Sequence, residues 1–120
     1  MNTITQKILI VDDSAFMRTV LKNILENVGC KNFIEAANGN EAIEKISSEK
    51  PDLVLMDIIM PEKGGMDVLK EIGTSTKVIM ISAVGQEKII EEAMKLGAKG
   101  YLVKPFDNRQ VEDEILKILG

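Results

Sequence analysis

The 120-residue sequence predicts an α/β fold, an open and doubly wound parallel sheet with helices on both faces. Short continuous apolar runs alternate with longer amphipathic stretches five times along the chain. Continuous apolar runs are typical of parallel strands buried on both faces. No repeat, low-complexity tract or change of composition interrupts the alternation. We therefore expect a single domain over residues 1–120.

Five apolar runs have the length of strands and lie between turn or helix-start signals. The second run is the weakest, because Glu35 interrupts it. The predicted strands are Ile8–Val11, Phe33–Ala37, Leu53–Met56, Val78–Ile81 and Tyr101–Val103.

Five amphipathic stretches predict helices between and after these strands. Gly29 suits a left-handed cap at the end of the first helix, and Pro51 forbids continuation of the second. The apolar residues at helical spacing are Phe16, Val20, Ile24 and Val28; Ala42, Ile43 and Ile46; Met66, Leu69 and Ile72; Ile89, Ala93 and Leu96; and Val111, Ile115, Ile118 and Leu119.

Composition excludes several classes of function. The chain has no histidine, which removes histidine general bases and histidine-dependent nucleophiles. A lone Cys30 excludes an internal disulfide and a zinc site built on several cysteines. A net charge of −4 with 3% aromatics disfavours a nucleic-acid surface. No membrane-length apolar run or signal peptide is present, so we expect a cytoplasmic protein without nucleic-acid or membrane partners.

Polar residues follow four of the five predicted strands. Asp12 and Asp13 follow the first, Asp57 the third, Ser82 the fourth and Lys104 the fifth. Ligands bind at the carboxyl ends of the strands in such sheets, so we expect these side chains to meet. The second strand contributes no comparable residue.

Each of these residues also has an ordinary structural interpretation. The two aspartates at the first strand can cap the following helix. Ser82 can be a turn hydroxyl, and Lys104 a solvated lysine. Asp57 differs, because it interrupts an apolar stretch in which an unpaired carboxylate is costly to bury. The joint pattern favours a shared site.

Three converging carboxylates repel one another, and Lys104 supplies one positive charge. A hard divalent cation completes the balance, and Mg²⁺ suits a sparse oxygen ligand set. A site of this kind attracts phosphate. Asp57, alone on its strand, is the predicted nucleophile that forms an acyl phosphate, with Lys104 and Ser82 contacting the phosphoryl oxygens.

Five motifs occur in order along the chain: Ile8–Ser14, Asp52–Asp57, Met60–Pro61 with Gly65, Ser82–Ala83, and Lys104–Phe106. In this order and spacing they resemble the receiver domain of two-component response regulators. The resemblance implies a flavodoxin-like three-layer αβα sandwich with five helices and a five-stranded parallel sheet of order 2-1-3-4-5. It implies one receiver domain over residues 1–120 without an output domain.

The resemblance also implies a set of site residues. Asp57 would be phosphorylated from a phosphohistidine on a sensor kinase, which accounts for the absence of histidine in this chain. Mg²⁺ would be held by Asp13, Asp57 and the backbone carbonyl of Ile59, with Asp12 acting largely through a water on the metal. Ser82 would move toward the phosphoryl group.

Three further expectations come from the same resemblance. Tyr101 would turn inward behind Ser82, although an ordinary edge-strand aromatic is the alternative. Lys104 would pair with the phosphate, and its peptide bond to Pro105 would be cis.

Ile59 and Val84 are apolar where many members of the family carry polar side chains. The polar side chains of those family members help to position the water that hydrolyses the phosphorylated aspartate. We therefore expect slow self-dephosphorylation and no enzymatic activity beyond the protein's own phosphorylation and dephosphorylation.

The segments Ser14–Arg18 and Ser82–Gln86 resemble chemotaxis regulators of the CheY type. This implies a monomer with a CheA-type histidine kinase upstream. A flagellar or archaeal motor switch protein or adaptor would bind the face formed by the fourth helix, fifth strand and fifth helix. The alternative is a single-domain phosphorelay intermediate that passes its phosphoryl group to a histidine phosphotransfer protein.

Other classes fit less well. A haloacid-dehalogenase-type phosphatase needs an Asp-x-Asp pair, whereas Asp12 and Asp13 are adjacent. A flavodoxin-like electron carrier needs a Ser/Thr-rich loop after the first strand and aromatics around the flavin. Only the acidic site argues against a purely structural interaction domain.

Overall fold

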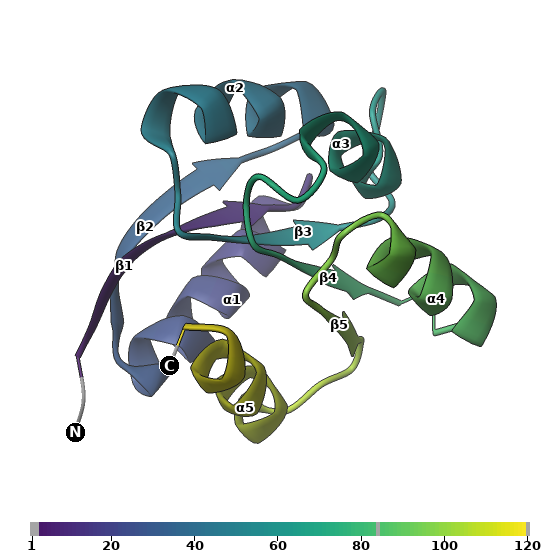
Figure 1. Cartoon of the computed structure of the whole chain (residues 1–120). Helices are drawn as coiled ribbons and strands as arrows, with labels where there is room; N and C mark the ends of the chain where they lie inside the picture. The colour runs from purple at the N-terminus through teal and green to yellow at the C-terminus, as the bar shows by residue number, and fades with distance from the viewer. Residues whose placement is uncertain (1–2, 84, 120) are drawn as a thin grey trace.

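The computed structural model describes residues 3–83 and 85–119, in which five parallel strands alternate with five helices (Figure 1). The strands are β1 (Ile4–Val11), β2 (Cys30–Ala36), β3 (Leu53–Asp57), β4 (Val78–Ser82) and β5 (Gly100–Val103). The helices are α1 (Ala15–Val28), α2 (Gly39–Glu49), α3 (Gly65–Ile72), α4 (Glu87–Lys95) and α5 (Asn108–Leu119). The sheet order is β2-β1-β3-β4-β5, so the predicted alternation and strand order are confirmed.

Strand boundaries differ from the prediction mainly at the β1–β2 edge. Both strands begin earlier than their apolar runs, and Ile4 pairs with Cys30 before a register irregularity that ends at Lys7. The backbone N–H of Ile4 donates to the carbonyl of Gly29 at 2.9 Å. Ladder hydrogen bonds need no apolar side chain, so hydrophobic periodicity does not detect this polar stretch.

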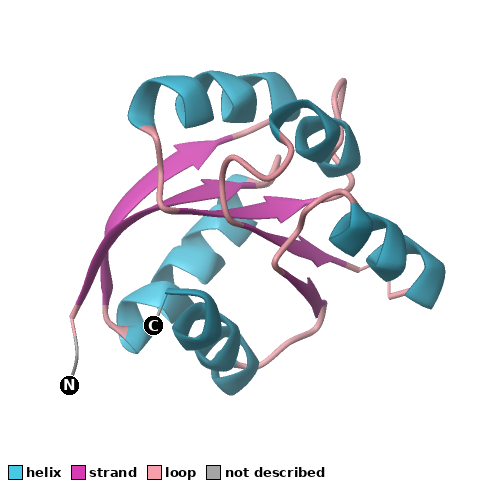
Figure 2. Ribbon diagram, in the orientation of Figure 1, coloured by secondary structure: helices cyan, strands magenta, loops and turns pink. Residues whose placement is uncertain are grey.

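Helices cover both faces of the sheet (Figure 2), and an apolar layer lies between the sheet and the helices on each face. Helices α2, α3 and α4 pack on one face, and α1 and α5 on the other. Alternate side chains of the central strands enter opposite layers: Leu9, Val54 and Met80 in the first, and Ile8, Leu55 and Ile79 in the second. These strands are buried on both faces, which explains their continuous apolar runs.

Two helix caps fix the connections of β1 to α1 and of α1 to β2. The Ser14 hydroxyl accepts a hydrogen bond from the Met17 N–H at 3.2 Å at the start of α1. Gly29 ends the helix with φ 115°, the left-handed C-cap predicted from the sequence. None of the helices in residues 3–83 and 85–119 combines the length and apolar character that a membrane crossing requires.

Leu55 on β3 is fully buried, whereas Leu116 on α5 is 47% exposed. Leu55→Ala should lower the free energy of unfolding by about 2–5 kcal/mol, because it leaves a cavity in the second layer. The same substitution at Leu116 should change it by less than about 0.5 kcal/mol. Urea denaturation of both variants measures the difference, and equal losses would contradict this description of the core.

Candidate functional site

The carboxyl ends of the central strands bring four of the predicted residues to one edge of the sheet. Asp12 follows β1, Asp57 ends β3, Ser82 ends β4 and Lys104 follows β5. The Lys104 Nζ lies 3.1 Å from the Asp57 Oδ2 and 3.4 Å from the Asp12 Oδ2. One ammonium therefore bridges two carboxylates from different strands, as the strand-end rule predicts.

Asp12 is the buried carboxylate of this pair, at 2% exposure. Burial raises the pKa of its carboxyl group above the ordinary value. A hydrogen bond of 2.9 Å from the Ser14 N–H to its Oδ1, together with the charge of Lys104, opposes this rise without cancelling it. The negative charge of Asp12 is thus only partly compensated in the folded protein.

Lys104 experiences the opposite balance. Burial alone lowers the pKa of its ammonium group, but the hydrogen bond and charge of Asp57, and then those of Asp12, raise it by more. The net pKa is above the ordinary value, so Lys104 stays positively charged between the two carboxylates.

Asp13, the neighbour of Asp12, makes no contact of this kind in the part of the chain that the structure describes. Its side chain is exposed and takes part in no hydrogen bond or ion pair with the rest of the described chain. Within the described ranges, no three histidine, cysteine or acidic side chains form a metal-ligand group. The predicted meeting of three carboxylates is therefore observed for two, and the ligand role of Asp13 stays a prediction.

The pair of carboxylates fits Mg²⁺. Two carboxylates against one ammonium leave a net negative charge on hard oxygen donors, and Mg²⁺ needs only one or two carboxylates because it retains several waters. The Ile59 N–H donates to the Asp57 Oδ1 at 3.2 Å, which places the Ile59 backbone beside that carboxylate. Ile59 itself is 64% exposed.

The loop from β3 to α3 folds back onto the site. The Gly65 N–H donates to the Ile58 carbonyl at 2.8 Å. A Cβ atom at Gly65 would collide with the Asp57 carbonyl oxygen. Glycine at this position therefore permits α3 to begin directly against the end of β3.

Ser82 and Tyr101 lie next to the bridged pair. Ser82 is 1% exposed and shares a side-chain hydrogen bond with Tyr101, a half-buried residue of β5. Burial is the main cause of a raised pKa at Tyr101, and the charge of Asp57 adds to it. The Tyr101 ring also packs against the α2–α3–α4 layer, so it is tied into the interior and to Ser82.

The peptide bond between Lys104 and Pro105 is cis, as the resemblance implies. The prediction made for Val84 lies outside the described residues.

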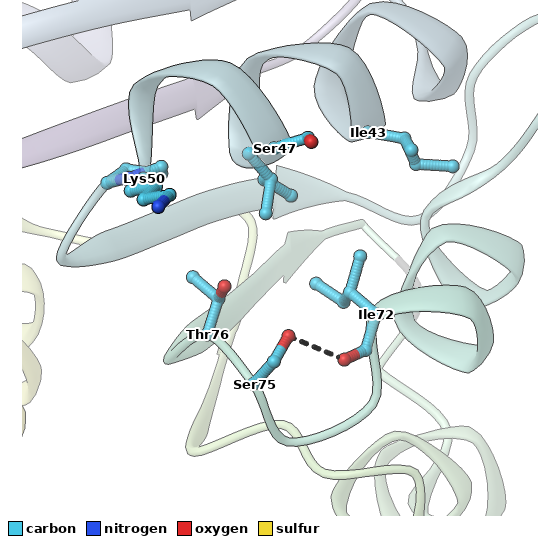
Figure 3. Close-up of a pocket in the computed structure, with 8 residues that line it drawn as sticks. Ile43, Ser47, Lys50, Ile72, Ser75 and Thr76 are labelled. Carbon is cyan, nitrogen blue, oxygen red and sulfur yellow. Dashed lines mark hydrogen bonds between the residues drawn. The ribbon is translucent and has the colours of Figure 1, made fainter.

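A groove of about 600 Å³ lies at the other end of the sheet (Figure 3). Lys50 and Pro51 line it just before β3, and Ser75 and Thr76 just before β4. The Ser75 hydroxyl donates to the Ile72 carbonyl at 2.7 Å. This groove is separate from the acidic site, which occupies the carboxyl ends of the strands.

Sequence reasoning missed the contribution of β2. Glu35, which interrupts the apolar run of this strand, accepts a hydrogen bond from the Arg18 Nε at 2.9 Å. The Arg18 Nη1 donates to the backbone carbonyl of Asp12 at 2.6 Å. A charged residue in an otherwise apolar strand run was the available signal.

The sheet order places the lysine-bridged acidic pair of this α/β domain at a topological switch point, where such sheets bind their ligands. A family model described as "Response regulator receiver domain" matches residues 8–116. The chain belongs to this family.

Known relatives narrow the similarity to the CheY type. The chemotaxis protein CheY of Thermotoga maritima is 47% identical over 116 residues, which cover 94% of this chain and 97% of that protein. CheY of Bacillus subtilis is 46% identical over 117 residues, which cover 95% of this chain and 98% of that protein. A crystal structure of the CheX-CheY-BeF3-Mg+2 complex from Borrelia burgdorferi matches with a TM-score of 0.91 and 34% identity, over 98% of this chain and 91% of that chain.

This similarity defines a response regulator of a two-component system and a receiver domain of the chemotaxis type. Receiver domains are regulatory switches in phosphorylation-dependent signalling.

The raised pKa of Asp12 predicts a stability cost at neutral pH. Between the ordinary value of 3.8 and the raised value, the native state binds more protons than the unfolded state, so stability falls as the pH rises through that range. Asp12→Asn should therefore raise the free energy of unfolding at pH 7 by on the order of 1 kcal/mol, and the melting temperature by several degrees.

Thermal unfolding with EDTA present measures this effect. The gain should vanish below about pH 3.8, where the wild-type carboxyl group is protonated in both states. A lower melting temperature of the variant at pH 7 would contradict the prediction.

Proposed function

We propose that this protein is a chemotaxis switch in which Asp57 accepts a phosphoryl group from the phosphohistidine of a CheA-type kinase. The phosphorylated form then signals to a motility motor through a switch protein or adaptor. The observation that carries the proposal is the position of Asp57 at the end of β3, with the Lys104 ammonium 3.1 Å from its Oδ2. The similarity to CheY proteins along nearly the whole chain supports the chemotactic role.

Phosphoryl transfer at this site needs a nucleophile and charge neutralisation. A carboxylate oxygen of Asp57 forms a bond to phosphorus, the bond from phosphorus to the donor imidazole nitrogen breaks, and that nitrogen keeps the electron pair. Lys104 neutralises the phosphoryl oxygens. Asp12, Asp13, Asp57 and the Ile59 carbonyl are the groups that would hold Mg²⁺, which supplies further neutralisation when bound.

The switch rests on Ser82 and Tyr101. Ser82 ends the strand beside β3, where Asp57 pairs with Ile81. A phosphoryl group on Asp57 offers the Ser82 hydroxyl a charged acceptor in competition with its hydrogen bond to Tyr101. A change at Tyr101 reaches the surface formed by α4, β5 and α5, which is the proposed docking face of a monomer.

Phosphorylation tests the proposal directly. Incubation with acetyl phosphate or phosphoramidate and Mg²⁺ should add the mass of one phosphoryl group to the wild type, and Asp57→Asn should abolish the gain. Asp67→Asn, at an exposed position in the first turn of α3, is the matched control and should be phosphorylated like the wild type. Absence of any gain in the wild type would refute the proposal, and EDTA should suppress the reaction.

The phosphoryl group should persist for minutes at 25 °C, because the exposed Ile59 side chain at the mouth of the site cannot position water. Ile59→Asn should accelerate its loss by about tenfold, since an amide can orient the attacking water. Ile59→Leu keeps an apolar side chain and should decay like the wild type. A wild-type half-life of a few seconds would overturn this expectation.

Binding to a labelled motor-switch protein, with and without phosphodonor, separates the two proposed outputs. Phosphorylation-dependent co-purification supports motor signalling. Transfer of the phosphoryl group from Asp57 to a histidine phosphotransfer protein, without motor binding, would instead identify a phosphorelay intermediate.

A further inference from the structure

Arg18 of α1 lies beside the acidic site and forms hydrogen bonds to residues at the ends of two strands. Its side chain is 17% exposed, and its guanidinium reaches from α1 to the ends of β1 and β2. The Nη1 donates to the Asp12 carbonyl at 2.6 Å, and the Nε donates to the Glu35 Oε1 at 2.9 Å. The planar guanidinium can hold both acceptors at once, because its donors have fixed directions.

The backbone of Asp12 is held on both sides by these contacts. Its N–H donates to the Ala36 carbonyl of β2 at 3.2 Å, and its C=O accepts from Arg18, which is anchored on Glu35 of the same strand. The Arg18 N–H donates to the Ser14 carbonyl, and the Ser14 N–H donates to the Asp12 carboxylate. Hydrogen bonds thus tie the turn that carries the two adjacent aspartates to both α1 and β2.

We propose that Arg18 is a positioning residue for the cation site, which fixes the turn of Asp12 and Asp13 through the Asp12 carbonyl while Glu35 orients the guanidinium. This inference rests on the proposed function, because it concerns the Mg²⁺ that the function requires. Groups that orient metal ligands from outside the ligand set typically contribute 10–100-fold to metal affinity.

The sign of the effect separates positioning from simple charge. As a positive charge near the carboxylates, Arg18 repels a cation, so its removal would tighten Mg²⁺ binding on electrostatic grounds alone. As the anchor of the turn, its removal must weaken binding. The two interpretations therefore predict opposite changes in the dissociation constant.

Isothermal titration calorimetry of the unphosphorylated protein with MgCl₂ measures this constant without reference to phosphoryl transfer. Arg18→Met should weaken binding by about 10-fold or more. Arg18→Lys keeps the charge but cannot reach both acceptors with a fixed fork, and should weaken binding by a smaller factor.

Lys22→Met is the matched control. Lys22 lies one turn further along α1, and its ammonium is 5.9 Å from the centre of the Phe33 ring. The substitution removes the same charge from the same helix without touching Asp12. Mg²⁺ affinity should be unchanged or slightly tighter.

A double-variant cycle tests the role of Glu35. Glu35→Ala should weaken Mg²⁺ binding in the wild-type background, and should have no further effect when Arg18→Met is present, because both act through one contact. Additive losses would show that Glu35 acts on the cation by its charge, and would overturn the proposed connection.

Wild-type affinity or tighter binding in Arg18→Met overturns the inference while the proposed function stands. If the wild type binds no Mg²⁺, the proposed function fails first. Circular dichroism checks folding, and if Arg18→Met does not fold, Arg18→Lys and Glu35→Ala decide the matter. Weaker binding in both supports the inference, and wild-type affinity in both overturns it.

Discussion

Lys104 holds two carboxylates together at the end of a sheet whose central strands are otherwise apolar. Asp12 follows β1, Asp57 ends β3 and Lys104 follows β5. The contact therefore exists only when the ends of these three strands are aligned across the sheet. The parallel sheet provides that alignment, and the two apolar layers hold the sheet in place.

The sequence predicts the sheet well because the burial of each central strand leaves a direct trace in its run of apolar residues. Buried parallel strands must be continuously apolar, and this identifies β3 and β4 almost to the residue. The meeting of Asp12, Asp57 and Lys104 follows from topology alone, since the carboxyl ends of parallel strands share one edge. The early start of β1 was missed because its pairing with β2 is made by backbone groups.

Side-chain direction is the part that periodicity does not determine. Asp12 and Asp13 are adjacent and chemically identical, yet one is 2% exposed and the other lies at the surface. Both residues follow the last residue of β1, and the hydrophobic pattern does not say which of the two carboxylates the surrounding elements bury. The bridge from Glu35 through Arg18 to Asp12 was likewise missed, because its residues lie far apart in the sequence and end on a backbone carbonyl.

The same unbalanced charge bears on stability and on the proposed signalling. Burial of Asp12 disfavours its ionised form, so the folded domain holds a carboxylate that a cation stabilises. The proposed phosphoryl group at Asp57 would add further negative charge beside Lys104 and Ser82. Either change would alter the charge that the neighbouring hydrogen-bonding groups face. In the proposed switch, the hydrogen bond between Ser82 and Tyr101 is one that such a shift would redirect, and the Tyr101 ring packs against the α2–α3–α4 layer.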